Sequence, residues 1–375
     1  MKQLIEKSGG KITFKQYMAE VLYHPTRGYY TRSKERLGSE GDFVTAPEIT
    51  SLFGELLALQ MIEIWHILGS PNRFQLIEMG PGTGRLAEDI LTTAKKFPDF
   101  YQALSYSLVE ISQDFQKQQA IRLQKAGVKA KARWYDTLQS AGSEKIVGVI
   151  LGNEFLDALP IHRVEQTAEG LAEISVQLSQ GEPFLETTLT PLTAEISADY
   201  MTSRHIVLEE GTQTEIGLEG EKWVEEAGSL LERGVLLMID YGLPQKGYYT
   251  PERRHGTVAG HLNHVRVDNP LDHPGEMDLT AHVNFTAMRD AGIRSGMHLL
   301  GYTTQGWFLM GLGILERLER LSSKEDESLA PLKEAVMRLI LPEGMGETFK
   351  VLALGKGMDG APLSGFRLSE QSEKL

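Results

Sequence analysis

The sequence predicts an α/β protein in which helices cover both faces of a doubly wound, mostly parallel sheet. Short apolar runs without strict alternation recur along the chain, among them residues 74–78, 105–110 and 146–151. Helical patterns separate these runs, and buried strands connected by helices are typical of a parallel sheet. A glycine-rich turn follows the first run, at the place where such sheets bind ligands.

Length and composition limit the class of protein. A chain of 375 residues exceeds one compact core of about 150, so we expect one large domain with insertions, or two domains. The 38 basic and 51 acidic residues give a formal charge of −13, which disfavours nucleic acid as the main partner. The chain has no cysteine, which excludes disulfides and cysteine-bound metals. Without a long apolar run or a signal-peptide core, we expect a cytoplasmic protein with no membrane span.

The first 72 residues predict an N-terminal helical cap. Apolar residues at helical spacing over residues 14–22 indicate a helix that His24-Pro25 ends. After an irregular segment, Thr45-Ala46-Pro47-Glu48 has the pattern of a capping box with proline in the first turn. The apolar stripe over residues 49–61 then predicts a helix that packs on the main core.

The remaining sequence predicts a seven-stranded sheet with two insertions. Strands are expected at residues 74–78, 105–110, 131–134, 146–151, 235–240, 297–302 and 349–354, with helices at about 85–96 and 114–125. The insertion after the fourth strand, residues 165–230, contains a predicted hairpin (174–178 and 184–189) and is expected to face the substrate. The insertion after the sixth strand, at about 305–341, contains helices at about 307–321 and 327–340. The expected division is 1–72 for the cap, 73–164 and 231–375 for the core, and 165–230 for the first insertion.

The most specific short motif is Glu78-Met79-Gly80-Pro81-Gly82-Thr83-Gly84, between a strand and a helix. Glycines there permit a tight turn and let a ligand approach backbone N–H groups at a helix start. The G-x-G-x-G spacing differs from the dinucleotide fingerprint, and no Gly-Lys-Ser/Thr follows as in a P-loop. A carboxylate at position 78 would repel a pyrophosphate but suits S-adenosylmethionine, which carries a sulfonium and an ammonium. The alternative is a turn that serves packing only.

Two more acidic residues follow predicted strands. Glu110 ends the second strand, where an acidic residue can accept hydrogen bonds from the ribose hydroxyls of an adenosyl group. Asp136 follows the third strand and is a candidate for the adenine amino group. Solvated loop or turn residues are the alternative at both positions.

Polar residues also follow the fourth strand, in Asn153-Glu154-Phe155-Leu156-Asp157. Their spacing would place Glu154 and Asp157 on one face of a helical turn, next to the first strand at the switch point of the sheet. Two carboxylates beside a cationic methyl donor can orient a guanidinium, whose planar fork suits bidentate pairing. We therefore predict Glu154 as the chief anchor, with Asp157 assisting and Asn153 accepting a hydrogen bond or shaping the turn. The alternative is that Asn153 and Asp157 cap a helix while Glu154 makes a structural salt bridge.

Three other features carry weaker predictions. The histidines between positions 255 and 282 fit no metal-binding spacing, and their proline- and glycine-rich setting predicts a loop over the active site. Tyr29, Tyr30 and Phe43 are candidates to cap the pocket. The leucine stripe at 312, 315, 318 and 321 indicates either core packing or a homodimer contact.

Several longer motifs together resemble one family. They are residues 41–49 (GDFVTAPEI), 78–84, 153–160, 239–242 (IDYG), 274–281 and 303–306, in this order. Over roughly residues 12–355 the chain resembles the MidA family, which are class I S-adenosylmethionine-dependent methyltransferases related to the mitochondrial arginine methyltransferase that assists assembly of respiratory complex I. Two departures, Glu215-Ile216-Gly217-Leu218 and the histidine-rich residues 253–264, leave the acceptor open.

The resemblance implies a Rossmann-like methyltransferase sheet, S-adenosylmethionine as the cofactor, and methyl transfer to an arginine of an acceptor protein such as a respiratory complex I subunit. It adds Asp42 and Thr45 to the predicted cofactor-binding residues, which are then Asp42, Thr45, Glu78, Gly80, Pro81, Gly82, Gly84, Glu110 and Asp136. Two alternatives stay open, a catalytically inert assembly factor that binds the cofactor and an NAD-dependent oxidoreductase.

Overall fold

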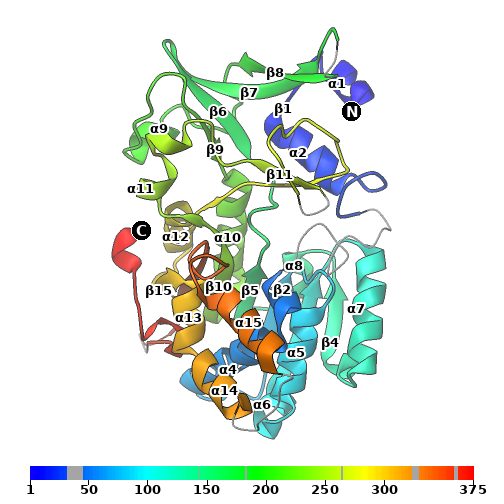
Figure 1. Ribbon diagram of the computed structural model, residues 1–375, viewed down its shortest axis with the longest axis vertical. Coiled ribbons are helices and arrows are strands. Elements are labelled where there is room, and N and C mark those ends of the chain that lie inside the picture. Colours follow the sequence, from blue (N-terminus) through cyan, green and yellow to red (C-terminus); the bar gives the residue numbers. More distant parts are fainter. Residues whose placement is uncertain (32–44, 143, 182–183, 263–264, 323–328, 359–361) are drawn as a thin grey trace.

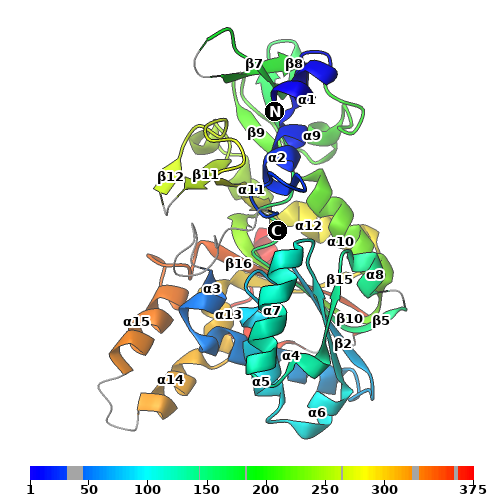
Figure 2. The same ribbon diagram turned by 90° about the vertical axis from the view of Figure 1, so that its right-hand side faces the viewer.

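The computed structural model describes residues 1–31, 45–142, 144–181, 184–262, 265–322, 329–358 and 362–375. Figure 1 shows a larger lobe built on a central sheet and, above it, a smaller lobe that contains the amino terminus. Figure 2 shows that the smaller lobe lies over one end of the central sheet. None of the helices in the described part of the chain has the length and apolar composition of a membrane span.

The central sheet is mixed, with strand order β15-β16-β10-β5-β2-β3-β4 and the short β14 beside β10. Its strands are β2 (Phe74–Met79), β3 (Leu104–Val109), β4 (Ala132–Tyr135), β5 (Ile146–Asn153), β10 (Leu231–Leu243), β14 (Val283–Asn284), β15 (His298–Thr304) and β16 (Phe349–Lys356). Neighbours from β10 to β4 pair in parallel, and β16 is antiparallel to both β10 and β15. The predicted α/β fold is therefore confirmed. The chain runs from β2 outward to β4 and then returns to β5 on the other side of β2, which makes the β2–β5 boundary the switch point.

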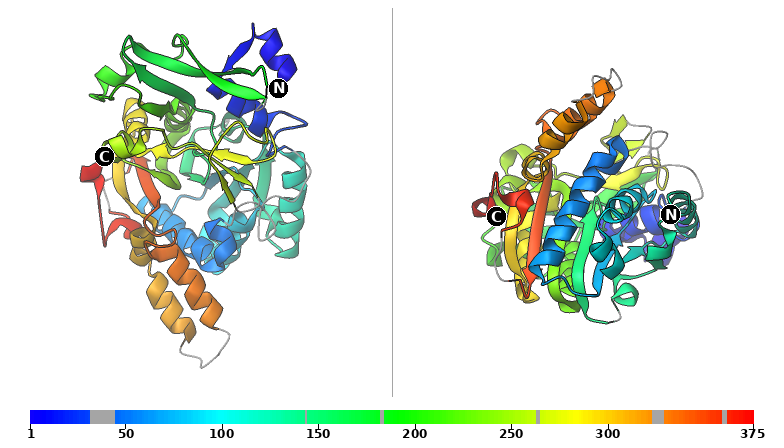
Figure 3. Two further views of the ribbon diagram at one scale, coloured as in Figure 1. Left: turned by 45° about the horizontal axis from the view of Figure 1, so that its top comes forward. Right: turned by 90° about the horizontal axis from the view of Figure 1, so that it is seen from below.

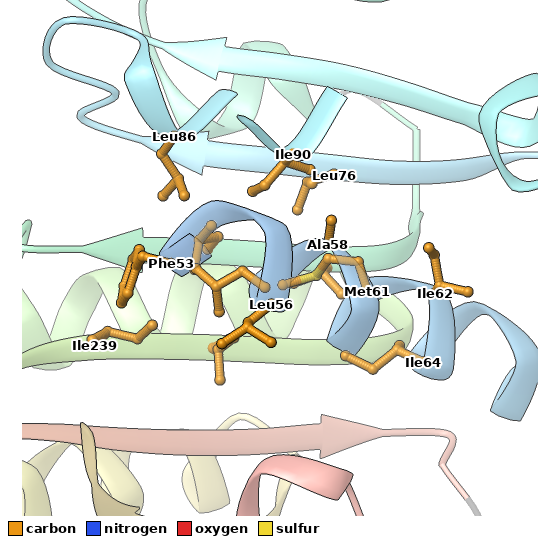
Figure 4. Packing of buried hydrophobic residues seen from close by; sticks show 14 of the residues in the cluster. Phe53, Leu56, Ala58, Met61, Ile62, Ile64, Leu76, Leu86, Ile90 and Ile239 are labelled. Atoms are coloured by element: carbon orange, nitrogen blue, oxygen red, sulfur yellow. The ribbon is translucent and has the colours of Figure 1, made fainter. Parts of the chain in front are cut away.

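Both faces of this sheet are buried, which explains why its strands lack alternation. On one face, Leu76 and Ile239 pack against α4 (Ser51–Ile67), as Figure 4 shows with Phe53 and Met61. The other helices of this face are α5 (Arg85–Ala94), α6 (Pro98–Ala103), α7 (Gln113–Lys125), α13 (Gln305–Gly311), α14 (Ile314–Ser322) and α15 (Leu329–Ile340). On the opposite face, Ile77 packs in a cluster with residues of α8 (Leu138–Ala141), α10 (Leu218–Leu230) and α12 (Phe285–Arg294). Each fully buried large aliphatic side chain contributes about 1.5–3 kcal/mol.

The helix predicted to start at the capping box is interrupted. The short α3 (Ala46–Ile49) ends at Thr50, whose backbone is extended, and the Thr50 side chain then accepts from the Leu52 N–H at 3.3 Å to cap α4. Thr45 makes no capping hydrogen bond with its side chain, so the capping-box prediction is wrong. The physical reason is that the carboxylate of Glu48 accepts a hydrogen bond from the Thr83 hydroxyl of the glycine turn.

The smaller lobe combines the amino terminus, the first insertion and a later segment that includes residues 259–262 and 265–280. One sheet has the order β1-β7-β6-β9, with β8 beside β7, and a second has the order β12-β11-β13. The strands are β1 (Lys11–Thr13), β6 (His162–Thr167), β7 (Gly170–Leu178), β8 (Leu185–Thr190), β9 (Gln213–Ile216), β11 (Ala259–Leu262), β12 (Val265–Val267) and β13 (Asp278–Thr280). The short helices are α1 (Lys2–Lys7), α2 (Phe14–Tyr23), α9 (Tyr200–Ser203) and α11 (Gln245–Tyr248). An apolar cluster with Phe14, Val176 and Leu279 joins α2 to both sheets.

This arrangement confirms the predicted hairpin as β7 and β8. The histidine-rich segment is not only a loop, because β11 and β12 lie within it and pair with one another. The amino-terminal residues are shared between the lobes, since α2 packs in the smaller lobe and α4 on the central sheet. The expected division at 1–72, 73–164, 165–230 and 231–375 stays a prediction.

In the described residues of the predicted helical insertion after the sixth strand, 305–322 and 329–341, the structure has three helices in place of the two expected. The helix expected over 307–321 divides at Gly313, whose φ of +88° ends α13 before α14 begins. Figure 3 shows α14 and α15 projecting away from the larger lobe. The leucine stripe divides as well, because Leu318 is buried in the core whereas Leu315 is 41% exposed.

Candidate active site

A cavity of about 330 Å³ lies at the carboxyl ends of β5, β2, β3 and β4, between the two lobes. Each of these four strands leads into a predicted site residue that lines the cavity, namely Asn153, Glu78, Glu110 and Asp136. Adjacent parallel strands end at one edge of a sheet, so residues distant in sequence meet there. The volume is within the range of small-molecule sites.

The glycine turn forms one wall of this cavity. Gly80 and Gly82 have φ of +57° and +52°, and both line the cavity with Pro81. These left-handed conformations explain the need for glycine. Gly84 also has a positive φ, +77°, but it lies behind the turn, where an added Cβ would be 3.0 Å from Gln119 Cγ. Gly84 therefore lets α7 approach the turn.

Two buried carboxyl groups flank the turn. Tyr106 donates a hydrogen bond to Glu78 Oε2 at 2.7 Å, and Glu110 Oε1 accepts from the Ser112 N–H at 2.8 Å. Burial raises the pKa of Glu78 to about 7 and that of Glu110 to about 7, because a charged carboxylate loses its hydration. Either group would become fully ionised beside a cation or a set of hydrogen-bond donors.

Gln119 is a positioning residue that the sequence analysis missed. It is fully buried, and its Nε2 donates to the Gly82 carbonyl at 2.7 Å and to Glu110 Oε2 at 3.3 Å. Its Oε1 accepts from Trp134 Nε1 at 2.8 Å. Gln119 thus fixes the turn relative to Glu110. The sequence does contain a signal, because Phe115, Gln119 and Leu123 share one helical face, and a glutamine inside an apolar stripe needs polar partners.

Of the other predicted cofactor-binding residues, two line the cavity and one lies outside the described residues. Asp136 lines the cavity beside Thr137, with Phe115 providing apolar surface nearby. Thr45 also lines the cavity, on the side of Glu48. Asp42 lies outside the described residues, as does Phe43.

All three predicted catalytic residues line the cavity, where Asn153 ends β5 and the following turn carries Glu154 and Asp157. This turn is not helical: Glu154 has a φ of +51°, which is unusual for a residue other than glycine. Asp240, within β10, sets this shape, because its Oδ2 accepts from the N–H groups of Phe155 (3.1 Å), Leu156 (2.9 Å) and Asp157 (3.3 Å). The predicted helical turn is therefore wrong. So is the alternative that Asn153 and Asp157 cap a helix, since β6 is the next element.

The partners of Glu154 are neutral donors. Its Oε1 accepts from the Ala46 N–H at 3.2 Å and from Asn153 Nδ2 at 3.4 Å, so within the described part of the chain it forms no structural salt bridge. Burial and the neighbouring Asp157 raise the pKa of Glu154 to about 8, and burial raises that of Asp157 to about 6. Burial, with Asp157 and Glu154 adding repulsion, raises the pKa of Asp240 well above its usual value.

Two buried oxygen atoms in this turn, Asn153 Oδ1 and Asp157 Oδ1, have no hydrogen-bond partner among the described residues. Buried acceptors are normally paired, so Asn153 Oδ1 indicates a donor supplied by a ligand. The hydroxyl of Tyr241, which also lines the cavity, is a nearby donor for Asp157 and limits the rise of its pKa.

The smaller lobe supplies the remaining wall. Tyr30 Oη donates to Asp278 Oδ1 at 2.7 Å, and Tyr23 Oη donates to the Ala158 carbonyl at 2.8 Å. The Tyr23 and Tyr30 rings stack with centroids 5.6 Å apart, and both line the cavity. Tyr29 lies in the apolar core of the smaller lobe and is not part of the lining. Of the three aromatic residues predicted to cap the pocket, Tyr30 is thus the one that the described structure brings to it.

Comparison with known proteins assigns the chain to a family. A family model described as "putative S-adenosyl-L-methionine-dependent methyltransferase" matches residues 56–303. The protein arginine methyltransferase NDUFAF7 homolog of Drosophila melanogaster is 32% identical, over 97% of this chain and 88% of its own length. Human protein arginine methyltransferase NDUFAF7 is 33% identical, over 93% of this chain and 81% of its own length. The chain belongs to the MidA/NDUFAF7 family of S-adenosylmethionine-dependent methyltransferases.

A solved structure supports the same assignment. A likely methyl transferase from Burkholderia thailandensis bound to S-adenosyl-homocysteine has a TM-score of 0.91 and 34% identity, and the match covers 100% of this chain and 95% of that one. Membership of the MidA/NDUFAF7 family confirms the predicted family and its cofactor, S-adenosylmethionine. It also favours methyl transfer over the NAD-dependent alternative.

Proposed function

We propose that this MidA/NDUFAF7-family protein transfers a methyl group from S-adenosylmethionine to the guanidinium of an arginine in an acceptor protein. The observation that carries the proposal is the turn after β5, where the half-buried Glu154 and the buried Asp157 line the same cavity as the glycine turn. The relatives named protein arginine methyltransferases support an arginine acceptor. By the same resemblance, the acceptor would be a protein like a respiratory complex I subunit.

The cofactor would occupy the part of the cavity between the glycine turn and β4. Gly80, Pro81 and Gly82 present backbone without bulky side chains, and Glu78 provides negative charge for the cationic end of the ligand. Glu110 would bind the ribose hydroxyls and Asp136 the adenine amino group. Thr45 and Asp42 complete the proposed set.

The protein would accelerate this reaction chiefly by positioning the two substrates and by stabilising the transition state electrostatically. The cofactor, when bound, supplies a methyl group on its sulfonium. Asp157 and Glu154 would hold the guanidinium, whose positive charge lowers their raised pKa values and ionises them. As the nitrogen–carbon bond forms, the sulfur–carbon bond breaks and its electrons stay on sulfur. The nitrogen then loses one proton, which Glu154 can accept at Oε2, because its Oε1 already binds Ala46 and Asn153.

Methyl transfer into a cell lysate tests the proposed function. The purified protein is incubated with S-adenosylmethionine labelled in its methyl group, and the labelled protein is hydrolysed to identify the modified amino acid. We expect methylarginine in one or a few proteins. Label confined to another residue type, or no labelling above that with the Gly82→Val variant, would contradict the proposal.

We further propose that the insertion 165–230 binds the acceptor protein. None of the described residues of this insertion, 165–181 and 184–230, lines the cavity, so its contribution would be contacts outside the reacting centre. Shortening the hairpin between β7 and β8 near Ser179 should leave affinity for S-adenosylhomocysteine unchanged while raising KM for the acceptor several-fold. Calorimetry and the labelling assay measure the two quantities, and equal losses in both would show that the insertion supports the cofactor site instead.

The raised pKa values predict that stability depends on pH. Glu78, Glu110 and Glu154 have folded-state pKa values of about 7, 7 and 8, above their ordinary value of 4.5. Between pH 5 and 8, roughly the interval between the two sets of pKa values, the folded state binds more protons than the unfolded state, so the free energy of unfolding falls as pH rises. We therefore expect the Tm of the ligand-free protein to fall across this range.

The same protonation predicts how ligands respond to pH. Sinefungin carries an ammonium in place of the sulfonium, so its affinity should rise with pH more than that of S-adenosylhomocysteine. Thermal unfolding at constant ionic strength measures both effects. Repulsion between the negative charges of this acidic protein also lowers Tm as pH rises, so the Glu154→Gln variant is the control. The fall of its Tm with pH must be shallower than that of the wild type. An equal slope would show that Glu154 is already ionised without ligand.

A cytoplasmic location, the absence of a nucleic-acid partner and a homodimer through the leucine stripe stay predictions. Light scattering of the purified protein, with a charged residue in place of the exposed Leu315, tests the dimer.

A further inference from the structure

Asp278 brings a third acidic side chain to the acceptor end of the cavity, from the smaller lobe. It begins β13, is 6% exposed, and lines the cavity together with Glu154 and Asp157. The end of β13 is joined to the turn after β5 (residues 154–158, here called the acceptor turn), because the Ala281 N–H donates to the Asp157 carbonyl at 3.0 Å. After burial and Asp157, the charge of Asp278 also contributes to the raised pKa of Glu154, as expected for neighbouring carboxyl groups.

Two tyrosines hold this side chain in place. Tyr30 donates to Asp278 Oδ1 at 2.7 Å, its ring stacks on Tyr23, and Tyr23 donates to the carbonyl of Ala158, the neighbour of Asp157. This series of contacts connects Asp278 to the acceptor turn across the two lobes. β11 pairs with the whole of β13, which fixes the backbone of Asp278 as well. Such support on both sides is typical of residues that bind a ligand with defined geometry.

We propose that Asp278 is an acceptor-binding residue that makes the site select a guanidinium over an ammonium, an inference that rests on the proposed function. A guanidinium is planar and has five N–H donors spread over its edges, whereas an ammonium is a compact point charge. Glu154 and Asp157 come from one turn, and Asp278 comes from another element of another lobe. Carboxylates from two elements can pair with two edges of a planar cation, and the aromatic rings of Tyr23 and Tyr30 provide flat apolar surface beside it.

Binding of two small probes tests this role separately from turnover. N-acetyl-arginine amide and N-acetyl-lysine amide are titrated into the protein saturated with S-adenosylhomocysteine, and binding is followed by ligand-observed NMR. In the wild type, the arginine amide should bind at least 10-fold more tightly than the lysine amide. Asp278→Asn should reduce that preference by about 10-fold and leave the affinity for S-adenosylhomocysteine within about 3-fold. Tyr30→Phe, which keeps the charge of Asp278 but removes the hydrogen bond from the Tyr30 hydroxyl, should cause a smaller loss of the same kind.

The control is Asp268→Asn, because Asp268 is an exposed aspartate of the same lobe, paired with Arg266 and absent from the cavity lining. Asp268→Asn should change neither the preference for the arginine amide over the lysine amide nor the affinity for S-adenosylhomocysteine. If Asp278→Asn keeps the wild-type preference for the arginine amide, the proposed role of Asp278 is contradicted, even when the wild type forms methylarginine in the lysate. If the wild type binds S-adenosylhomocysteine but neither binds the arginine amide nor forms methylarginine, the proposed function itself is wrong. Should Asp278→Asn fail to bind S-adenosylhomocysteine, the Tyr30→Phe variant decides, and an unchanged preference in it contradicts the proposal.

Discussion

Replacing Gly82 with valine is expected to abolish the stabilisation of the protein by S-adenosylhomocysteine. In the wild type, ligand at about 100 times its Kd should raise the free energy of unfolding by about 2.7 kcal/mol. Gly82 lines the cavity with a φ of +52°, and its carbonyl accepts from Gln119. A β-branched side chain is strained in that conformation by about 1–3 kcal/mol and would occupy space where a ligand approaches the backbone.

The control for this substitution separates strain from ligand binding. Gly69, between α4 and β2, also has a left-handed backbone, with a φ of +86°, and an added Cβ there meets no other atom within 4 Å. Gly69→Val should therefore lower Tm by strain yet keep the full shift with ligand. A folded Gly82→Val protein whose Tm still rises by the wild-type amount would place the cofactor elsewhere.

The sequence predicts the larger lobe well because its elements follow from local patterns. Most of its strands are buried on both faces, so they appear as short apolar runs, and the parallel strands β2, β3, β4 and β5 end at the edge where the site lies. For that reason Glu78, Glu110, Asp136 and the turn after β5 could be predicted to meet before any coordinates were known. The glycines of the turn were informative for a similar reason, since their positive φ values are a local requirement.

The smaller lobe and the shape of the acceptor turn depend on contacts that no local pattern contains. Tyr30 and Asp278 are distant in sequence and share no motif, yet they form one hydrogen bond on the cavity wall. The spacing of Glu154 and Asp157 suggested a helical turn because periodicity describes only neighbouring residues. The actual turn is set by Asp240, a buried carboxyl group from another strand that binds three successive N–H groups. Such competition between local preference and a distant partner is where sequence patterns fail.

Replacing Glu154 with glutamine is expected to slow methyl transfer at least ~100-fold, which corresponds to about 2.7 kcal/mol of activation free energy. Glutamine keeps the size of the side chain and an oxygen that can still accept from the Ala46 N–H. It removes the negative charge that would hold the guanidinium and the basic oxygen that would take its proton. Affinity for S-adenosylhomocysteine should change by less than ~10-fold, or about 1.4 kcal/mol, because Glu154 follows β5 while the glycine turn follows β2.

Glu110→Gln is the matched comparison at the other end of the cavity, and the two variants should have opposite effects. Glu110 is a buried carboxyl group with a similarly raised pKa, but its partners, Ser112 and Gln119, belong to the cofactor side. Its loss should weaken S-adenosylhomocysteine binding about 10-fold, roughly 1.4 kcal/mol, and leave kcat at saturating S-adenosylmethionine nearly unchanged. Calorimetry and single-turnover labelling separate the two quantities. Because both substitutions remove one carboxyl group with a raised pKa, a general loss of stability cannot produce this opposite pattern. If Glu154→Gln transfers methyl groups at the wild-type rate, the carboxyl groups of the turn are structural and the acceptor is held elsewhere.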